Sequence, residues 1–152
     1  MVLRPTRKTL FAVEAVLDIA YNAGPNPVQS QDITRRQGIP RRYLEQVLQQ
    51  LGRAGILTGT RGPRGGYRLA RERRRITVGA IVRAVQNADS VAHARNEGSD
   101  SALGQKIVQP LWDELEHSFL ENLDTITIQD LCQRARLANV ASEGAERLDY
   151  SI

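Results

Sequence analysis

The sequence is short of cysteine and of long apolar runs, and each shortage excludes a class of protein. Cys132 is the only cysteine among 152 residues, so it cannot form an intramolecular disulfide or by itself hold zinc or an iron–sulfur cluster. No apolar segment approaches the roughly 18 residues of a membrane-spanning helix, and the basic N-terminus is not followed by the apolar core of a signal peptide. We therefore expect a cytoplasmic protein without a membrane partner.

Arrangements of residues typical of catalysis are also missing. The sequence contains no paired nucleophile and base, no metal-binding triad and no Gly-Lys-Ser/Thr phosphate loop. The two histidines, His93 and His117, lie in unrelated contexts. We therefore do not expect an enzyme. A disulfide between the Cys132 residues of two dimers is a minor alternative, because this cysteine is expected to be a small buried hydrophobe.

Positive charge is concentrated in the first half of the chain. Residues 1–75 contain 15 Lys and Arg against 5 Asp and Glu, a balance of +10, and residues 76–152 contain 6 against 12, a balance of −6. The two halves sum to the formal net charge of +4. The first half therefore suits a polyanion that the second half would repel. The length and the hydrophobic content of 41% suit one main folded domain.

Residues 30–54 predict a helix-turn-helix. Ser30 is expected to cap the first helix with its hydroxyl, and Gly38 to end it. Pro40 suits the start of a second helix, which should end at Ala54, before Gly55. Apolar residues recur in this second helix at steps of three and four and predict one buried face, made of Tyr43, Leu44, Val47, Leu48 and Leu51.

The opposite face of the second helix is polar and long-chained. It carries Arg41, Arg42, Glu45, Gln46, Gln49 and Arg53. Such side chains form hydrogen bonds with base edges and phosphates, so we expect this helix to read double-stranded DNA. The first helix of such a motif usually crosses the DNA backbone. Arg35 and Arg36 are therefore expected to be solvated or near phosphates rather than in contact with bases.

A two-stranded hairpin, or wing, is predicted after the second helix. Its strands, residues 56–60 and 66–70, flank the sequence RGPRGG, whose glycines allow a close approach to a sugar–phosphate ridge. Arg61, Pro63 and Arg64 lie in this tip, and an arginine there suits the narrow minor groove of A·T-rich DNA. The arginine-rich residues 71–75 are expected to form a solvated turn that adds at most non-specific attraction to DNA.

Two short helices should complete the DNA-binding domain, one on either side of the helix-turn-helix. The first, within residues 4–22, should begin at Thr6 and bury a stripe made of Leu10, Val13, Leu17 and Ala20, widened by Phe11, Val16 and Ile19. The second, residues 76–86, is capped by Thr77 and should turn inward Val78, Ile81, Val82 and Val85.

The rest of the chain predicts a loop, a long helix and a short last helix. Residues 87–102 lack apolar periodicity and are expected to form a flexible loop. Residues 103–123 should form a helix that begins or kinks near Pro110. Its wide apolar face needs a partner, and the simplest is a second copy of the chain, although folding back onto its own chain is an alternative. The dimerisation residues are predicted to be Leu111, Trp112, Leu115, Phe119 and Leu123.

The predicted fold class is therefore mainly α with a small β-hairpin. A winged helix-turn-helix domain occupies residues 1–86, the loop residues 87–102, and dimerisation helices residues 103–138, the last of them capped by Thr127. The tail, residues 139–152, has low apolar density and is expected to be disordered.

Five segments together resemble one family of bacterial winged-helix regulators, typified by the iron–sulfur cluster regulator. The segments are FAVEAVLDIA, IPRRYLEQVLQQLGRAGIL, RGPRGGYRLA, ITVGAIVRAV and LWDELEHSFLENLDTITIQDL, and they span roughly residues 4–136. The resemblance implies a homodimer, held by the helix around Trp112, on a palindromic operator. It places Glu45 and Gln46 on the base-reading face, with Glu45 tuning operator choice, and Arg61 on the wing arginine. Arg42 and Tyr43 fall near positions that contact the DNA backbone.

The chain departs from that family in its cluster ligands. Cluster-sensing members carry three cysteines in the loop before the long helix, whereas residues 87–102 contain none, and Lys106 and Gln109 fall nearest the last cysteine and the histidine. We therefore expect no conventional cluster, no metal and no cofactor. An unusual metal site remains an alternative, made of His93, Asp89, Glu97 and Asp100.

Two functional hypotheses remain after this comparison. The first is a cluster-free repressor whose DNA affinity responds to a small molecule or a protein effector. The second is a winged-helix module for protein–protein assembly that has lost DNA binding. The basic first half and the two wing arginines, Arg61 and Arg64, favour the first hypothesis.

Overall fold

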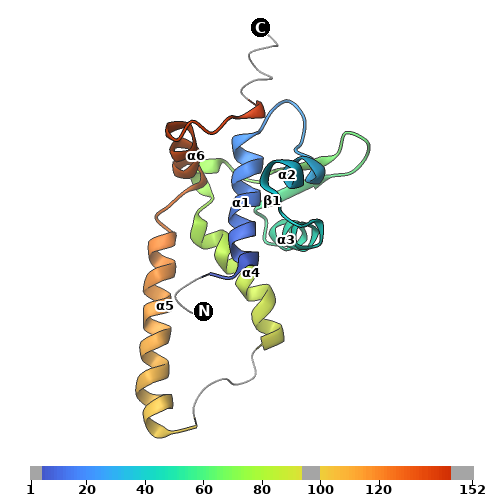
Figure 1. Ribbon diagram of the computed structural model, residues 1–152. Coiled ribbons are helices and arrows are strands. Elements are labelled where there is room, and N and C mark those ends of the chain that lie inside the picture. Colours follow the sequence, from blue (N-terminus) through green and yellow to red (C-terminus); the bar gives the residue numbers. More distant parts are fainter. Residues whose placement is uncertain (1–4, 94–99, 145–152) are drawn as a thin grey trace.

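The computed structural model describes residues 5–93 and 100–144, and for residues 87–93 it describes the backbone only. A helical domain with a small hairpin occupies one end of the molecule, and a single long helix extends away from it (Figure 1). The predicted fold class is confirmed. Within the described residues, no helix is both long enough and apolar enough to cross a membrane.

Helix α1 (Arg7–Tyr21) is the centre of the domain and contacts α2, α3, α4 and α6. Thr6 caps it as predicted, because its Oγ1 accepts a hydrogen bond from the Thr9 amide at 3.2 Å. The predicted inward stripe is wrong in part: Leu10 is 48% exposed. The fully buried face is instead made mainly of small residues, Ala12, Ala15, Val16, Ile19 and Ala20. Small side chains let the surrounding helices approach closely, which a count of large apolar residues does not predict.

Helices α2 (Ser30–Gln37) and α3 (Arg41–Arg53) form the predicted helix-turn-helix, and α2 ends at Gly38 with a φ of +68°. Leu44, Val47, Leu48 and Leu51 are buried as predicted. Tyr43 is not, being 38% exposed at the edge of that stripe. The prediction that Ser30 caps α2 is also wrong. Gln29 occupies the cap position, and no side chain there makes a capping hydrogen bond.

Strands β1 (Leu57–Thr60) and β2 (Gly66–Leu69) pair antiparallel to form the wing, with Leu57 opposite Leu69 and Thr60 opposite Gly66. Each is one residue shorter than predicted. A short 3₁₀ turn, η1 (Arg73–Arg75), follows the wing and leads into α4 (Val78–His93).

Helix α4 begins as predicted, since the Ala80 amide donates to Thr77 Oγ1 at 3.0 Å and Val78, Ile81, Val82 and Val85 are buried. It continues past Gln86 to His93, so the prediction of a loop from residue 87 onward is wrong for the first seven residues. An established helix extends by adding one backbone hydrogen bond per residue, which does not require apolar periodicity. The predicted loop also includes residues 94–99, which lie outside the described residues.

The long helix begins near Ala102, passes through a π-helical turn, η2 (Gly104–Val108), and continues as α5 (Gln109–Leu123). The π turn ends at Val108, two residues before Pro110. A proline ring inside a helix collides with the carbonyl four residues earlier, here that of Lys106, and a π turn is one way to relieve the collision. The irregularity predicted near Pro110 is therefore present.

Helix α6 (Ile128–Leu137) follows α5 and packs against α1 and η1. Its predicted cap is confirmed as a reciprocal pair: Asp130 N–H donates to Thr127 Oγ1 at 3.1 Å, and Thr127 N–H donates to Asp130 Oδ2 at 2.9 Å. This pairing holds the pKa of the Asp130 carboxyl below its usual range, chiefly through the Thr127 backbone amide.

Two backbone hydrogen bonds join the start of α4 to the segment between α5 and α6. Val78 N–H donates to Ile126 O at 2.8 Å, and Ile128 N–H donates to Ile76 O at 2.9 Å. Arg83 of α4 also forms an ion pair with Asp124 at the end of α5. We call this set of contacts the α4–α5 junction.

The first residues of the tail are ordered, contrary to the prediction. Residues 139–144, here called the C-terminal strap, run back over the end of α1 (Figure 1). Ser142 Oγ donates to Tyr21 O at 2.6 Å, and Glu143 N–H donates to Asn22 Oδ1 at 2.9 Å. The Tyr21 hydroxyl in turn donates to Val140 O. The remainder of the predicted tail, residues 145–152, lies outside the described residues.

Candidate nucleic-acid interface

The polar face of α3 is open to solvent over its whole first half. Arg41, Arg42, Glu45 and Gln46 are all exposed, while the opposite face of the same helix is buried in the core. A helix of this kind presents side chains with donors and acceptors to a partner and keeps its backbone fixed by the domain beneath it. The structure therefore brings together these four predicted contact residues.

Tyr43 is held at the edge of this face by its neighbours. Its ring lies 6.0 Å from the Phe11 ring of α1, and the Arg42 guanidinium carbon lies 5.6 Å from the Tyr43 ring centre. Arginine stacks favourably on an aromatic face, so this contact restricts the long Arg42 side chain before any partner arrives. Tyr43 is 38% exposed, so part of its side chain remains accessible to a partner.

Arg41 and Glu45 form an ion pair one helical turn apart, with Arg41 Nε 3.0 Å from Glu45 Oε1. Both side chains are mostly exposed, so the pair contributes little to stability. Its consequence is electrostatic: the carboxylate of Glu45 partly neutralises Arg41 in the free protein. A phosphate that binds Arg41 must therefore displace Glu45. A base-edge donor that binds Glu45 must displace Arg41.

The wing is fixed to the segment before α2 by an additional two-residue pairing. Val28 N–H donates to Tyr67 O at 3.0 Å, and Tyr67 N–H donates to Val28 O at 2.7 Å. Gly66 makes this possible, because a Cβ there would lie 2.5 Å from Val28 O. Val28 was not among the predicted interface residues. The only hint in the sequence is that it is an isolated apolar residue in the polar segment PNPVQS.

A hollow of about 520 Å³ lies between the start of α2 and the tip of the wing. Ser30, Gln29, Arg61 and Pro63 contribute to its walls, and the Gln29 side-chain amide donates to Pro63 O at 3.4 Å. Backbone N–H groups in the first turn of a helix attract anions. No side chain caps the start of α2, so its first backbone N–H groups are not occupied by a cap. Arg61 and the Ser30 hydroxyl lie beside them around the same hollow, an arrangement that suits a phosphate.

Arg61 and Arg64 are exposed at the wing tip, and neither pairs with a carboxylate in the part of the chain that the structure describes. The arginines of α2 are different. Arg36 is only 13% exposed and forms a two-bond ion pair with the fully buried Asp18 carboxylate, at 2.7 and 2.9 Å. The expectation that Arg36 is solvated or faces phosphate is therefore wrong: it joins α2 to α1.

Metal ligands do not gather among the described residues, where no group of three or more His, Cys, Asp and Glu could hold an ion. The single cysteine lies inside α6 with its side chain fully buried, as predicted. Burial raises the pKa of the Cys132 thiol, an effect that the nearby Arg73 and Arg136 oppose. The side chains of His93 and Asp89, and all of Glu97, lie outside the described residues.

Helix-turn-helix, exposed recognition face and arginine-tipped hairpin together define a DNA-binding protein of the winged-helix class. The family model for Rrf2, an iron-dependent transcriptional regulator, matches residues 5–134. The chain belongs to the Rrf2 family of transcriptional regulators, and its family and relatives are regulators rather than enzymes.

Curated relatives and solved structures agree with this assignment. The transcriptional regulator IscR of Pectobacterium atrosepticum is 36% identical over 141 residues, covering 91% of this chain and 85% of that protein. IscR of Vibrio cholerae is 35% identical over 150 residues, covering 99% and 84%. The solved structure of IscR from T. potens superposes with a TM-score of 0.71 at 33% identity, covering 92% of this chain and 93% of that one. The cysteine regulator CymR of B. subtilis superposes with a TM-score of 0.67 at 26% identity, covering 88% and 98%.

Proposed function

We propose that this chain is a repressor that binds a palindromic operator as a homodimer, with α3 in the major groove and Arg61 of the wing in the minor groove. The observation that carries the proposal is that α3 presents an exposed polar face, while the wing exposes Arg61 and Arg64, neither of which pairs with a carboxylate among the described residues. A recognition helix and a wing that reach adjacent grooves have this arrangement.

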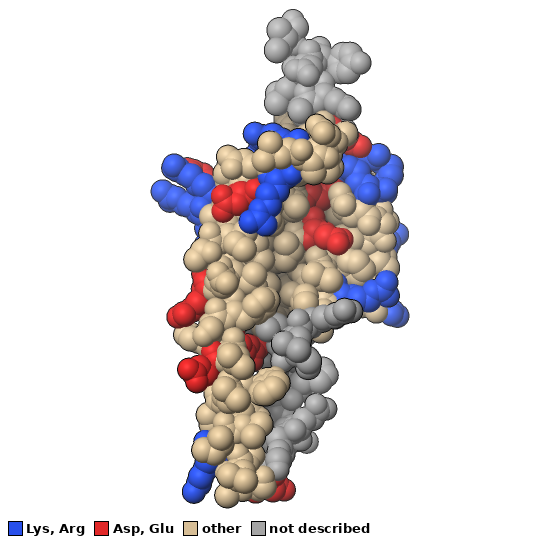
Figure 2. All heavy atoms as spheres, turned by 60° about the vertical axis from the view of Figure 1, so that its left-hand side comes forward, with Lys and Arg blue, Asp and Glu red and all other residues tan. Residues whose placement is uncertain are grey.

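The long helix supports the dimer. Leu111, Trp112, Leu115 and Phe119 are each between 43% and 55% exposed, whereas Leu123, nearest the domain, is half-buried. The surface over the outer part of this helix is largely free of charged side chains on the face shown in Figure 2. Apolar side chains that recur along one helix in water are covered most simply by the same helix of a second copy.

The donor set supports regulation without a conventional iron–sulfur cluster. Such a cluster takes several cysteine thiolates, and this sequence has one cysteine, which α6 buries in the hydrophobic core of the domain. The proposed regulation therefore does not depend on a bound iron–sulfur cluster. The effector is instead a small molecule or a protein.

Genomic fragments captured by the purified, metal-free protein provide the first test. We expect enrichment of a palindromic site. Arg61→Ala should weaken binding to every sequence and lower the salt dependence by about one counterion per subunit, while Glu45→Ala should relax sequence preference. The matched control is Arg134→Ala, which removes an exposed arginine of α6, outside the helix-turn-helix and the wing. Failure to retain DNA at low salt, with the variants behaving alike, would overturn the proposal and favour a protein-docking module.

A further inference from the structure

A second cavity lies at the opposite side of the domain, between the end of α1, η1, α6 and the C-terminal strap. Its volume is about 460 Å³, within the range of small-molecule sites. Arg73, Arg136, Asn139 and Ser142 provide polar groups, and Ala20 and Val140 provide apolar wall. No acidic residue lines it. The cavity on the other face of the strap differs, because it is lined by Glu14, Asp18 and Glu143 together with a single arginine.

The two arginines of this cavity carry charge that nothing nearby neutralises. Among residues 5–93 and 100–144, neither Arg73 nor Arg136 pairs with a carboxylate. The nearby Cys132 thiol supplies no counter-charge, because burial raises its pKa and favours the neutral form, an effect that Arg73 and Arg136 only oppose. Two guanidinium groups at one cavity without a counter-charge are a recognition site for an anion.

Asn139 lies where the chain turns out of α6 into this cavity wall. Its φ of +60° makes it the one non-glycine residue of the described chain in the left-handed region. Asparagine tolerates that conformation better than most residues. The strap thus leaves α6 in a fixed direction, and Asn139 lines the same cavity as Arg73 and Arg136.

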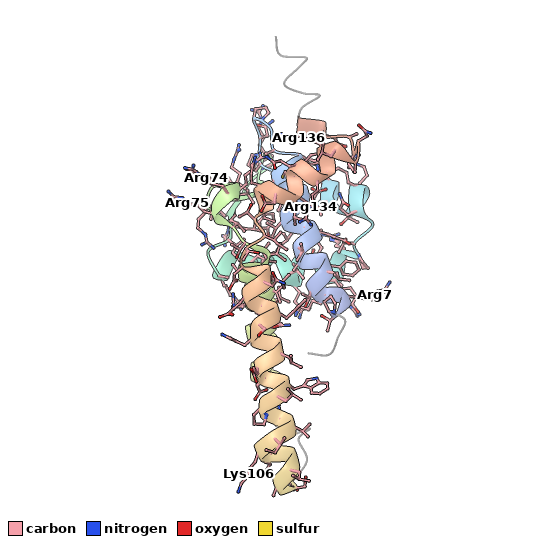
Figure 3. The ribbon with its side chains drawn as sticks, turned by 90° about the vertical axis from the view of Figure 1, so that its left-hand side faces the viewer. Arg7, Arg74, Arg75, Lys106, Arg134 and Arg136 are labelled. Carbon is pink, nitrogen blue, oxygen red and sulfur yellow. The ribbon has the colours of Figure 1, made fainter. Side chains whose placement is uncertain are left out.

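We propose that this cavity binds a small organic anion, a carboxylate or phosphate compound held by Arg73 and Arg136. A concave site with apolar wall fits a small molecule better than a nucleic-acid backbone, which follows exposed surfaces. Figure 3 shows Arg74, Arg75, Arg134 and Arg136 at the same end of the molecule, with Lys106 at the far end of the long helix. Arg134 and Arg75 do not line the cavity and serve as its matched controls.

The strap connects the cavity to the helix-turn-helix. One residue after Ser142, the Glu143 carboxylate lies 2.8 Å from Arg35 Nη2 and 2.6 Å from Arg36 Nη1. An anion that holds the strap in place therefore also holds Glu143 against α2. Since α2 starts at the hollow beside the wing, occupancy of the cavity should raise operator affinity. Coupling between two such sites is typically about 5- to 150-fold. This consequence, unlike the binding itself, rests on the proposed function.

Anion binding can be measured without DNA, using inorganic phosphate and malonate as probes. We expect saturable shifts of the Arg73 and Arg136 Nε–Hε signals in NMR titrations at constant ionic strength. Arg136→Gln should abolish saturation, and Arg134→Gln, two residues away on the same helix, should leave it unchanged. Equal titration of both variants, or the absence of saturation by either probe in the unaltered protein, would overturn the proposal.

Coupling is measured as the affinity for the captured DNA with and without malonate, chloride being adjusted to keep ionic strength constant. Glu143→Gln should keep the Arg136 titration and lose the effect on DNA, because it breaks the connection to α2. An unchanged DNA affinity at saturating malonate would refute the coupling. A protein that titrates normally but captures no DNA would refute the proposed repressor and leave the anion site standing.

Discussion

Two regions of the molecule use the same kinds of apolar residue in opposite ways. In the winged-helix domain, Leu44, Leu48 and Leu51 of α3 are almost completely removed from water by α1 and α4. On α5, Leu111 and Leu115 are about half exposed. Among the described elements, this helix packs mainly against α4 and the adjoining turn η2. The domain buries its apolar face within one chain, whereas the apolar face of the long helix stays exposed to solvent in the single chain. Residue type alone does not distinguish the two regions; their neighbours do.

Truncation of a buried leucine sharpens this comparison with the largest expected effect. Leu48→Ala should lower the free energy of unfolding by about 2–5 kcal/mol, because it leaves a cavity among fully buried neighbours. Urea denaturation followed by circular dichroism measures the change. An effect below 1 kcal/mol would show that α3 repacks easily and is not part of a tightly packed core.

The α4–α5 junction, where the two regions meet, should respond next. A Cβ on Gly79 would overlap the Asp124 carboxylate oxygen and lie 3.0 Å from the Asp124 backbone nitrogen. Gly79→Ala should therefore destabilise the protein by about 1–3 kcal/mol. Gly52→Ala is the control, since Gly52 lies in α3 with nothing within 4 Å of its Cβ position, and it should stabilise by about 0.5–1 kcal/mol. Thermal unfolding of both variants decides whether the junction is as rigid as its contacts indicate.

Leu115→Ala should separate folding from association. Leu115 is 55% exposed, so the variant's unfolding free energy, extrapolated to low protein concentration, should change by about 0.5 kcal/mol or less. Self-association should weaken about tenfold, as for a residue in the centre of an interface. Sedimentation at several concentrations measures the second quantity. A monomer at every concentration in the unaltered protein would mean that α5 is covered by something other than its copy.

The smallest effect is expected at the strap. The hydrogen bond from Arg35, together with Arg36, lowers the pKa of Glu143 below its usual value. Because the pKa of Glu143 is lower in the folded protein, its ion pairs stabilise the docked strap fully at any pH above the pKa of an unfolded glutamate. That stabilisation is lost as the pH falls from about 4.3 through the folded value. Proteolysis of the strap should therefore speed up in acid. Glu143→Gln should remove this pH dependence, and a variant with the same acid response would contradict the assignment to Glu143.

The elements that could be predicted from the sequence are those specified by nearby residues. The turn at Gly38, the periodic apolar face of α3 and the reciprocal cap at Thr127 and Asp130 all involve residues within a few positions of each other. The exposed contact residues of α3 and of the wing could be predicted for the same reason, because a strongly amphipathic helix exposes its polar face wherever it packs.

The features that could not be predicted depend on distant partners. Glu143 and Arg36 are 107 positions apart, and no local pattern indicates that a polar tail segment returns to α2. The pairing of Val28 with Tyr67 and the exposure of Tyr43 have the same origin, since both depend on how the wing and α1 approach the helix-turn-helix. Low apolar density correctly describes the tail's composition but does not predict the ion pairs that fix its first residues.

The α4–α5 junction also fixes how far and in which direction the long helix extends from the domain. Backbone bonds from Val78 and Ile128 and the ion pair between Arg83 and Asp124 fix the direction in which α5 leaves the domain. Its 15 residues give it a length of about 22 Å. In the proposed dimer, the distance between the two recognition helices would then be set by the angle and length of this arm within each chain. The dimer should therefore bind much more weakly to an operator with one base pair added between its half-sites, because a rigid helix cannot change the spacing of the two recognition helices.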